Sequence, residues 1–404
     1  MDQAATARPD QDDTTVTATG AALRVALVTE TYPPEINGVA HTLSHLAQGL
    51  ALRGHAVEVV RPRQDATDRA TDVPATTQGI TQLLTGGLPA PGYPGLHLGL
   101  PAGRRLRRRW RAQRPDVVYI ATEGPLGHSA LAAARHLQIP VLSGFHTNFD
   151  AYTRFYRIGL LEPLVLAWLR RFHNRCQGTL APTAALAARL EARGFRHMGV
   201  LARGVDTTLF DPARRDPALR TAWGLAPGAL AVLYVGRLAA EKNIALTIEA
   251  FKAIRRVHPD SRLVLVGDGP LRERLARELP EAIFCGPRRG EDLARHYASA
   301  DLFLFASTSE TYGNVVIEAM ASGLPVLTYD YAAGREHIHP GVNGQLAPFD
   351  DAPAFVAAAL AMTRDPQALQ ALGRQARITA ERLAWGRIIQ RFEHGLRAAI
   401  QAAR

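Results

Sequence analysis

The stretch RVALVTETYPPEINGVAHTLSHLAQGLALRG, residues 24–54, predicts the unit from which this chain is built. Residues 24–30 form a short apolar run rich in Val and Leu, which is typical of a buried strand. A polar loop follows, and residues 38–54 carry apolar side chains at helical spacing. Because a strand buried on both faces must be covered by helices, this strand–loop–helix unit predicts a parallel sheet.

The same alternation continues through the first half of the chain. Further apolar runs, each followed by a helix-like segment, occupy residues 55–62, 115–122, 140–146 and 178–183. Strands that alternate with helices in this way indicate an α/β domain with a doubly wound sheet. We therefore predict a Rossmann-like domain over residues 23–205.

A second set of strand candidates begins after residue 228. Its members are residues 231–238, 262–269, 282–287, 301–308 and 325–330. The connecting segment is rich in Asp, Arg and Pro and lacks strand character, so the domain boundary is expected there. Two such domains in tandem would leave a cleft between the carboxyl ends of their sheets.

The second Rossmann-like domain is expected over residues 206–384. The chain then ends in a helical region, 351–403, with a break near Asp365–Pro366. Its last part, residues 385–404, is expected to form a helix that packs back on the first domain.

The bulk properties favour a two-domain protein without a membrane span. The 404 residues exceed what one core usually supports, and no run of eighteen apolar residues occurs. Residues 1–22 are polar and lack the apolar segment of a signal peptide, so we expect a disordered tail. Cys176 and Cys285 match no metal spacing and are expected to be buried free thiols, which fits a reducing cytoplasm.

The net charge of +10 comes mostly from arginine, which is densest in GRRLRRRWRAQR, residues 103–114. This run predicts either a solvated helix face or a surface that binds an anionic membrane. The sequence shows no zinc finger, helix-turn-helix or aromatic stacking motif, so nucleic acid is not an expected partner. The candidates for a weak acceptor or membrane contact here are Arg104, Arg105, Arg107, Arg108 and Trp110.

SETYGNVVIEAMASGLPV, residues 309–326, contains Glu310 and Glu318, whose spacing invites comparison with the carboxylate pair of a glycosidase. Glu310 follows a predicted strand, and Glu318 lies one to two turns into a predicted helix that stops at Gly323. At about 100° per residue, eight residues leave the two side chains roughly 80° apart. The pair therefore does not form one face.

The helix that begins near Gly313, Asn314 and Val315 would present free N–H groups to an anion such as a phosphate. The two glutamates would then contact hydroxyl groups on either side of that phosphate. One helix-capping acid and one solvated acid is the alternative.

GRLAAEKN, residues 236–243, follows the first strand of the second domain. Arg237 and Lys242 would lie at the carboxyl end of that strand, facing the same crevice. Two cations beside a helix N-terminus suit a diphosphate leaving group, because they neutralise its developing charge without a metal. An ordinary surface pair is the alternative.

The first domain contributes weaker signals. Gly38 would let the backbone approach a ligand closely, although the dinucleotide fingerprint is missing. His146 ends a predicted strand, where either a ligand contact or ordinary packing explains it. Residues 151–173 mix aromatic, Leu and Arg side chains, which suits a membrane-interface helix or a buried helical face. Asp150 and Tyr152 are the acceptor candidates in this region.

From about residue 24 to 395 the chain resembles the family 4 retaining glycosyltransferases of the GT-B fold. ETYGNVVIE (310–318) matches the E-x7-E motif of the family, and GRLAAEKN matches its G-R-x4-K segment. RGVDTTLF (203–210) matches the G-V-D-x3-F turn between the domains. FHTNFDAYTRFY and ARGVDTTLF are most similar to GDP-mannose-dependent α-mannosyltransferases that build glycolipids, and UDP-sugar-dependent sulfoquinovosyl transferases are close.

The resemblance implies roles for individual residues. Arg237 and Lys242 would hold the donor diphosphate, and Glu310 would contact the hydroxyls of the donor sugar. Glu318 would bind the ribose, and His146 would lie beside the transferred sugar. The other implied donor contacts are Asn37, Gly38, Gly236, Tyr312, Gly313, Asn314 and Val315, with base contacts between Phe284 and Arg288. The first loop reads NGV where many members carry paired glycines.

The expected reaction needs no metal or cofactor, because no Asp-x-Asp site lies in a suitable place; the nucleotide-sugar is a co-substrate. The expected function is transfer of mannose from GDP-mannose, or of a sugar from a UDP-sugar, with retention. The acceptor would be a lipid or glycolipid at the cytoplasmic membrane face. A glycoside hydrolase, a nucleotide-dependent dehydrogenase or epimerase, and a sugar- or membrane-binding protein are the rival interpretations.

Overall fold

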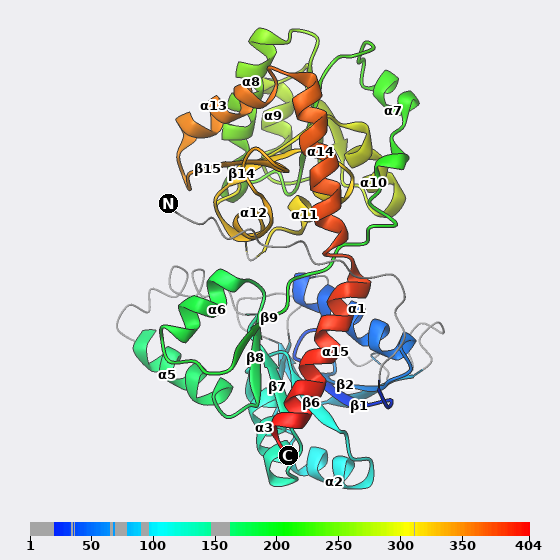
Figure 1. Cartoon of the computed structure of the whole chain (residues 1–404), viewed down its shortest axis with the longest axis vertical. Helices are drawn as coiled ribbons and strands as arrows, with labels where there is room; N and C mark the ends of the chain where they lie inside the picture. Colours follow the sequence, from blue (N-terminus) through cyan, green and yellow to red (C-terminus); the bar gives the residue numbers. More distant parts are fainter. Residues whose placement is uncertain are drawn as a thin grey trace, which may run out of the picture.

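The computed structural model describes residues 20–33, 35, 37–64, 68, 79–89, 97–146, 162–310 and 312–404. Most of the expected N-terminal tail, together with Asp150 and Tyr152, lies outside these residues. The chain forms two α/β lobes stacked along the long axis of the molecule (Figure 1).

The N-terminal lobe is built on a seven-stranded sheet with the order β3-β2-β1-β6-β7-β8-β9. All its pairings are parallel, and β1 lies between β2 and β6 with Val25 opposite Val57 and Val117. Its strands are β1 (Arg24–Val28), β2 (Ala56–Pro62), β3 (Ile80–Thr85), β6 (Val117–Ile120), β7 (Val141–Gly144), β8 (Gly178–Ala181) and β9 (Met198–Val200). A separate antiparallel hairpin joins β4 (Gly87–Pro89) to β5 (His97–Gly99).

Helices cover both faces of this sheet. The helices are α1 (Gly38–Leu52), α2 (Gly103–Ala112), α3 (Pro125–His136), α5 (Glu162–His173) and α6 (Ala184–Glu191). The apolar side chains of α2 and α3 share one core cluster with β1 and β6, while those of α1 belong to a second cluster. The sheet is therefore buried on both sides, as its Val- and Ile-rich strands require.

The C-terminal lobe carries a six-stranded parallel sheet with the order β12-β11-β10-β13-β14-β15. The strands are β10 (Ala231–Val235), β11 (Arg262–Val266), β12 (Ile283–Gly286), β13 (Leu302–Phe305), β14 (Val326–Tyr329) and β15 (Gly344–Ala347). The helices are α7 (Pro217–Ala222), α8 (Ile244–Val257), α9 (Arg272–Glu278), α10 (Gly290–Ser299), α11 (Asn314–Ala321), α12 (Ala332–His337), α13 (Ala352–Met362) and α14 (Pro366–Glu381), with the 3₁₀ turns η1 (Pro212–Arg214) and η2 (Ala240–Lys242).

The chain passes between the lobes twice at one place. The Val205 N–H donates to the Leu383 carbonyl at 3.0 Å, and the Trp385 N–H donates to the Val205 carbonyl at 3.3 Å. The last helix, α15 (Trp385–Ala402), then returns to the N-terminal lobe and runs beside α1 (Figure 1). A Cβ on Gly49 would lie 2.1 Å from Ile389 Cδ1, so the glycine permits this close helix packing.

An ion-pair network fixes α15 on the N-terminal lobe. Glu393 accepts from Arg53 Nε at 2.7 Å and from Arg397 Nε at 2.9 Å. Burial alone would raise the pKa of Glu393, but hydrogen bonds from Arg53, Arg397 and His55 lower that pKa to about 2. The carboxylate therefore stays ionised throughout the neutral range and holds the C-terminal helix in place.

The basic run at residues 103–114 forms α2, whose two faces differ sharply. Arg104, Arg105 and Arg108 are exposed, and Arg107 is half-buried. Trp110, in contrast, is 0 % exposed, and its indole N–H donates to Glu58 Oε2 at 3.2 Å. The prediction that Trp110 contributes to an acceptor or membrane face is wrong, because the ring is a core side chain.

Candidate active site

The loop after β13 and the helix that follows it form the centre of the candidate site. Glu310 lies in this loop, and α11 begins at Asn314 behind Gly313, whose φ of 92° favours glycine. Since the N-cap residue is a glycine, it offers no side-chain acceptor to the first N–H groups of the helix. Those groups and the helix dipole suit an anion.

Lys242 and Glu310 join the two motifs of the C-terminal lobe. The Lys242 ammonium Nζ lies 2.5 Å from Glu310 Oε1, and Ser307 Oγ donates to the same oxygen at 2.8 Å. Both charged side chains are half-buried. Lys242 ends the turn η2 after β10, so the ends of two adjacent strands bring the pair together.

Arg237 follows the same strand but takes a different position. Its side chain is 64 % exposed, and Nη1 lies 3.3 Å from Glu241 Oε1. Gly236 beside it has a φ of 155°, and Tyr234 donates its hydroxyl to the Arg237 carbonyl at 2.9 Å. Arg237 thus lies on the loop with a largely exposed side chain.

Glu318 lies inside α11 and has its own partner. The Tyr297 hydroxyl of α10 donates to Glu318 Oε2 at 3.0 Å. Burial raises the pKa of Glu318 to about 7, against the opposing effect of the Tyr297 hydrogen bond. Glu310 and Glu318 therefore have separate surroundings: one is paired with a lysine, and the other titrates near neutrality.

The residues expected near a nucleotide base lie at the edge strand β12. Phe284 is half-buried on this strand, and Arg288 follows it in an exposed position. Arg288 Nη1 lies 3.0 Å from Asp292 Oδ2, and its Nε donates to the Cys285 carbonyl at 2.9 Å. β12 is two strands from β10, so the two strands lie about 10 Å apart across the sheet.

In the N-terminal lobe, Asn37 caps α1. Its Oδ1 accepts from the N–H groups of Val39 at 3.0 Å and Ala40 at 2.8 Å, and its Nδ2 donates to Thr31 Oγ1 at 2.6 Å. Two of the N–H groups at this helix start are therefore already occupied. An anion here would reach only the remaining N–H groups of the turn.

Gly38 faces an arginine. A Cβ on Gly38 would lie 2.5 Å from Arg203 Nη1, so no larger residue fits while Arg203 keeps this position. The close approach of a ligand to Gly38 stays a prediction, and in the structure the Arg203 side chain lies beside this glycine.

Arg203 is the functional candidate that sequence reasoning missed. It is 8 % exposed; its Nη1 lies 3.4 Å from Asn314 Oδ1, and its guanidinium lies 5.5 Å from the centre of the Tyr312 ring. Burial lowers the pKa of Arg203, whereas Tyr312 and Glu310 raise it. The residue therefore brings a positive charge from the N-terminal lobe to the start of α11.

His146 lies directly after β7 and belongs to the same electrostatic environment. Its Nε2 lies 3.1 Å from the Tyr119 hydroxyl. Burial, with a smaller effect from Arg203, lowers the pKa of His146 to about 4. The imidazole is therefore neutral near pH 7 and available for a hydrogen bond rather than as a cation.

The arrangement provides cations and helix N–H groups for an anion, and carboxylates for hydroxyls. Within the described ranges, no group of three or more His, Cys, Asp or Glu side chains is placed to hold a metal ion. No helix among the described residues is long and apolar enough to cross a membrane.

Comparison with known proteins gives consistent matches over both lobes. Residues 36–209 match the model described as Glycosyltransferase Family 4, and residues 229–365 match the model described as Glycosyl transferases group 1. The GDP-mannose-dependent alpha-mannosyltransferase of Mycobacterium tuberculosis is 36% identical over 81% of this chain and 84% of its own length. The sulfoquinovosyl transferase SQD2 of Arabidopsis thaliana is 29% identical over 90% of this chain and 71% of its own length.

The fold has solved counterparts. Anabaena HepE in complex with UDP superimposes with a TM-score of 0.72 over 93% of this chain and 100% of that chain, at 20% identity. The expected GT-B architecture, with two facing parallel α/β sheets, is therefore confirmed.

Proposed function

Because this chain belongs to the group 1 glycosyl transferases of glycosyltransferase family 4, we propose that it transfers mannose from GDP-mannose to a lipid or glycolipid acceptor with retention. The observation that carries the site assignment is the contact of Lys242 with Glu310 beside the uncapped start of α11. The name of the M. tuberculosis relative supports the donor.

The proposed donor site uses each charged group for one part of the ligand. Lys242, Arg237 and the first N–H groups of α11 bind the diphosphate. Glu310 accepts from hydroxyls of the sugar, and Glu318 accepts from the ribose hydroxyls. Arg203 supplies a further positive charge, since it already lies at 3.4 Å from the side chain of Asn314.

The proposed reaction is a substitution on one face of the sugar. The bond between C1 and the diphosphate oxygen breaks as the acceptor hydroxyl attacks C1 from the side on which the diphosphate departs. The acceptor proton passes to a leaving phosphate oxygen, and GDP is released. The growing negative charge on the diphosphate is stabilised by Lys242 and Arg237, so the reaction does not require a metal.

His146 has a positioning role in this proposal. As a neutral imidazole held by the Tyr119 hydroxyl, it offers a hydrogen bond to the transferred sugar without adding charge. A cation at this position would repel the partial positive charge that develops at C1.

The proposed acceptor surface lies on one side of the N-terminal lobe. α2 packs on α3, and His128 of α3 stacks on Trp168 of α5 with 4.7 Å between ring centres. On α5, Leu164 is 66 % and Trp168 46 % exposed, and Arg170 and Arg171 of the same helix are exposed too. Exposed apolar and aromatic groups with arginines suit peripheral binding to an anionic membrane, which we propose at the cytoplasmic face.

A UDP-sugar is the second candidate donor. The likeness to SQD2 and the UDP bound by the structurally similar HepE favour it. The roles of Lys242, Arg237 and Glu310 would be the same, because both donors carry a diphosphate linked to a sugar.

A donor screen tests the proposal. The purified protein is incubated with a lipid extract and GDP-mannose, UDP-glucose or another UDP-sugar, and products are identified by mass. A lipid product with one added hexose from GDP-mannose alone supports the proposal. A product formed only from a UDP-sugar would replace the proposed donor, and hydrolysis of glycosides without donor use would favour a hydrolase.

A further inference from the structure

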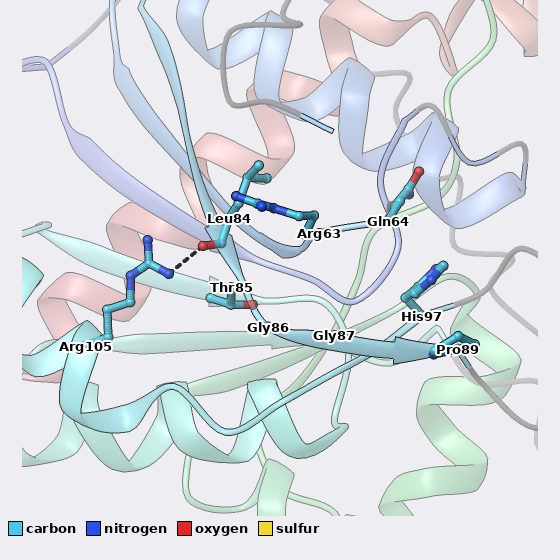
Figure 2. A pocket seen from close by; sticks show the side chains of 9 residues that line it. All are labelled: Arg63, Gln64, Leu84, Thr85, Gly86, Gly87, Pro89, His97 and Arg105. Carbon is cyan, nitrogen blue, oxygen red and sulfur yellow. Dashed lines mark hydrogen bonds between the residues drawn. The ribbon is translucent and has the colours of Figure 1, made fainter. Parts of the chain in front are cut away.

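The two lobes carry cavities at opposite edges of their sheets. A cavity of about 410 Å³ lies on the N-terminal lobe, beside Thr85 and Gly86 at the carboxyl end of β3 (Figure 2). Because open α/β sheets bind their substrates outside the carboxyl ends of the strands, this cavity belongs to the reaction side of the molecule. The cavity of the C-terminal lobe lies away from that side.

This second cavity has a volume of about 730 Å³, within the range of small-ligand sites. Its lining includes Leu230, Asp301 and Pro325, which directly precede β10, β13 and β14. It therefore lies at the amino ends of these strands, whereas Lys242 and Glu310 follow their carboxyl ends. The helix α14, which runs along this lobe in Figure 1, forms one wall. We call this space the α14 cavity; a ligand in it would be separate from the proposed donor site.

The walls of the α14 cavity are mainly aliphatic. Part of this surface faces solvent, since Ile378 is 47 % exposed. The described lining has no aromatic ring on which a nucleotide base could stack. The walls therefore suit an aliphatic chain better than a nucleotide. Their aliphatic side chains are Leu230, Leu324, Pro325, Leu369 and Ile378.

Positive charge exceeds negative charge in the same lining. It contains four arginines, and Asp301 is the one acidic residue among its described members. Arg215 Nη2 and Arg220 Nη1 lie 2.6 and 2.9 Å from the two oxygens of Asp301. Two guanidinium groups thus share one carboxylate, which leaves one of their charges without a carboxylate partner in the lining.

Arg374 adds a second charge without a partner. Among the described residues it forms neither an ion pair nor a hydrogen bond. It is exposed on α14, four residues after Gln370 and four before Ile378, so the three side chains follow one side of the helix, and all three line the cavity. A guanidinium beside an aliphatic wall suits the anionic head of a chain that packs on that wall.

The fourth arginine connects the α14 cavity to the junction of the lobes. Arg377 Nη1 donates to the carbonyls of Thr207 at 3.1 Å, Phe210 at 2.8 Å and Ala321 at 2.7 Å. Thr207 and Phe210 follow the crossing at Val205, and Ala321 ends α11. The eight residues of α11 cover only about 12 Å, so one end of this short helix contacts the cavity lining and the other begins the proposed donor site.

We propose that the α14 cavity binds an anionic amphiphile, a molecule with an aliphatic chain and a carboxylate or phosphate head. The head pairs with Arg374, and the chain packs on Leu369 and Ile378. This binding does not depend on the proposed transfer reaction. Its effect on the enzyme does: by packing on α14 beside Arg377, the ligand orders the junction and the end of α11, which favours donor binding.

Four probes separate the chain from the charge. Ligand-observed NMR measures binding of octyl phosphate, octanoate, octanol and inorganic phosphate to the full chain. Octyl phosphate or octanoate should bind at least about tenfold more tightly than octanol, which lacks the charge, and than inorganic phosphate, which lacks the chain. A preference between the two anionic probes distinguishes a phosphate head from a carboxylate. Binding of octanol equal to that of both anions, or of inorganic phosphate equal to that of octyl phosphate, would overturn the proposal.

Variants place the bound probe. Arg374→Gln and Ile378→Gln should each weaken binding of the preferred anionic probe at least about fivefold. Their controls are Arg256→Gln and Val257→Gln, which make the same changes at exposed positions of α8 outside the cavity lining. Equal binding by Arg374→Gln and the wild type would assign the probe to another surface and overturn the site.

The effect on the donor site has its own measurement. Titration calorimetry gives the Kd of GDP-mannose with and without saturating octanoate. The Kd should fall about fivefold in the wild type and stay unchanged in Arg374→Gln. An unchanged or higher Kd in the wild type would overturn the coupling. Failure of the proposed donor assignment looks different, because GDP-mannose would then not bind even without octanoate.

Discussion

Lys242 and Glu310, 68 positions apart in the chain, form an ion pair of 2.5 Å between the loops that follow the adjacent strands β10 and β13. Without a donor, each charge neutralises the other in a half-buried position. In the proposed complex, the lysine turns to the diphosphate and the carboxylate to the sugar hydroxyls. The ion pair therefore keeps both groups at the site until a donor replaces each partner.

Lys242→Ala should abolish most transfer activity and leave the fold intact. We expect kcat to fall by about 10²-fold or more, because the positive charge that stabilises the leaving diphosphate is lost. Initial rates with GDP-mannose and thermal unfolding check this. Lys252→Ala is the control, since Lys252 is exposed on α8. A variant with full activity would remove the diphosphate role from Lys242.

Gly38→Ala should disturb Arg203. The new methyl would lie 2.5 Å from Arg203 Nη1, so the guanidinium must move away from Asn314. We expect the donor Kd to rise about tenfold, which corresponds to loss of one hydrogen bond to a charged group.

Gly386→Ala on α15 is the matched control for Gly38→Ala, because nothing lies within 4 Å of its added methyl. That change should raise stability by up to about 1 kcal/mol through helix propensity. Calorimetry measures both variants; unchanged donor affinity in Gly38→Ala would show that the position of Arg203 does not matter for binding.

Donor affinity should depend on pH through Glu318. Burial raises the pKa of this carboxyl to about 7, so it gains a proton as the pH falls through 7 and then loses acceptor capacity for ribose hydroxyls. Affinity should fall between pH 8 and 6 by several fold. Glu318→Gln should flatten this dependence, whereas Glu30→Gln should not, although burial also raises the Glu30 pKa to about 7. If donor affinity depended on pH in the same way in Glu318→Gln and in the wild type, the ribose assignment would be contradicted.

The same pKa shift predicts a stability effect of definite sign. The folded-state pKa of Glu318 exceeds its ordinary value of 4.5, so the folded protein binds the proton more tightly than the unfolded chain. This contribution to the free energy of unfolding is fully present below pH 4.5 and is lost as the pH rises toward 7. The free energy of unfolding, measured by urea titration across that pH window, should therefore decrease less in Glu318→Gln than in the wild type.

The arginines of α2 should govern binding to anionic vesicles. Replacing exposed Arg104 and Arg108 with Gln should weaken vesicle binding and reduce its salt dependence, because each arginine near the surface contributes about 1 kcal/mol. Cosedimentation at two salt concentrations measures this. Unchanged binding would assign α2 to an ordinary solvated face.

Most of the strands that sequence analysis predicted are central ones, and the half-buried edge strand β12 is the exception. Val- and Ile-rich runs such as residues 231–235 are buried throughout, so their composition is unambiguous. The edge strands β3, β9 and β15 were missed, because half-exposed strands carry mixed side chains such as ITQLLT. The break near Asp365–Pro366 was predicted correctly, since Asp365 caps α14 and Pro366 begins it.

The sequence allowed us to predict the positions of candidate site residues that belong to motifs. It did not allow us to predict candidates whose surroundings form only by tertiary contact. Arg237, Lys242 and Glu310 were placed on strand-end loops correctly by the strand pattern. Arg203 was missed, because its burial against Gly38 and Tyr312 arises only when the lobes meet. Trp110 was assigned to the surface by its charged neighbours, although its spacing of four from buried Leu106 indicates the inward face of α2.

Titration calorimetry of the full chain with GDP-mannose, repeated with UDP-glucose and with Lys242→Ala, measures whether a donor binds at Lys242. We expect saturable binding of GDP-mannose, weaker binding of UDP-glucose, and at least a tenfold loss of affinity in Lys242→Ala. Absence of binding by any sugar nucleotide, or equal affinity in Lys242→Ala, would contradict a donor site built on Lys242 and Glu310.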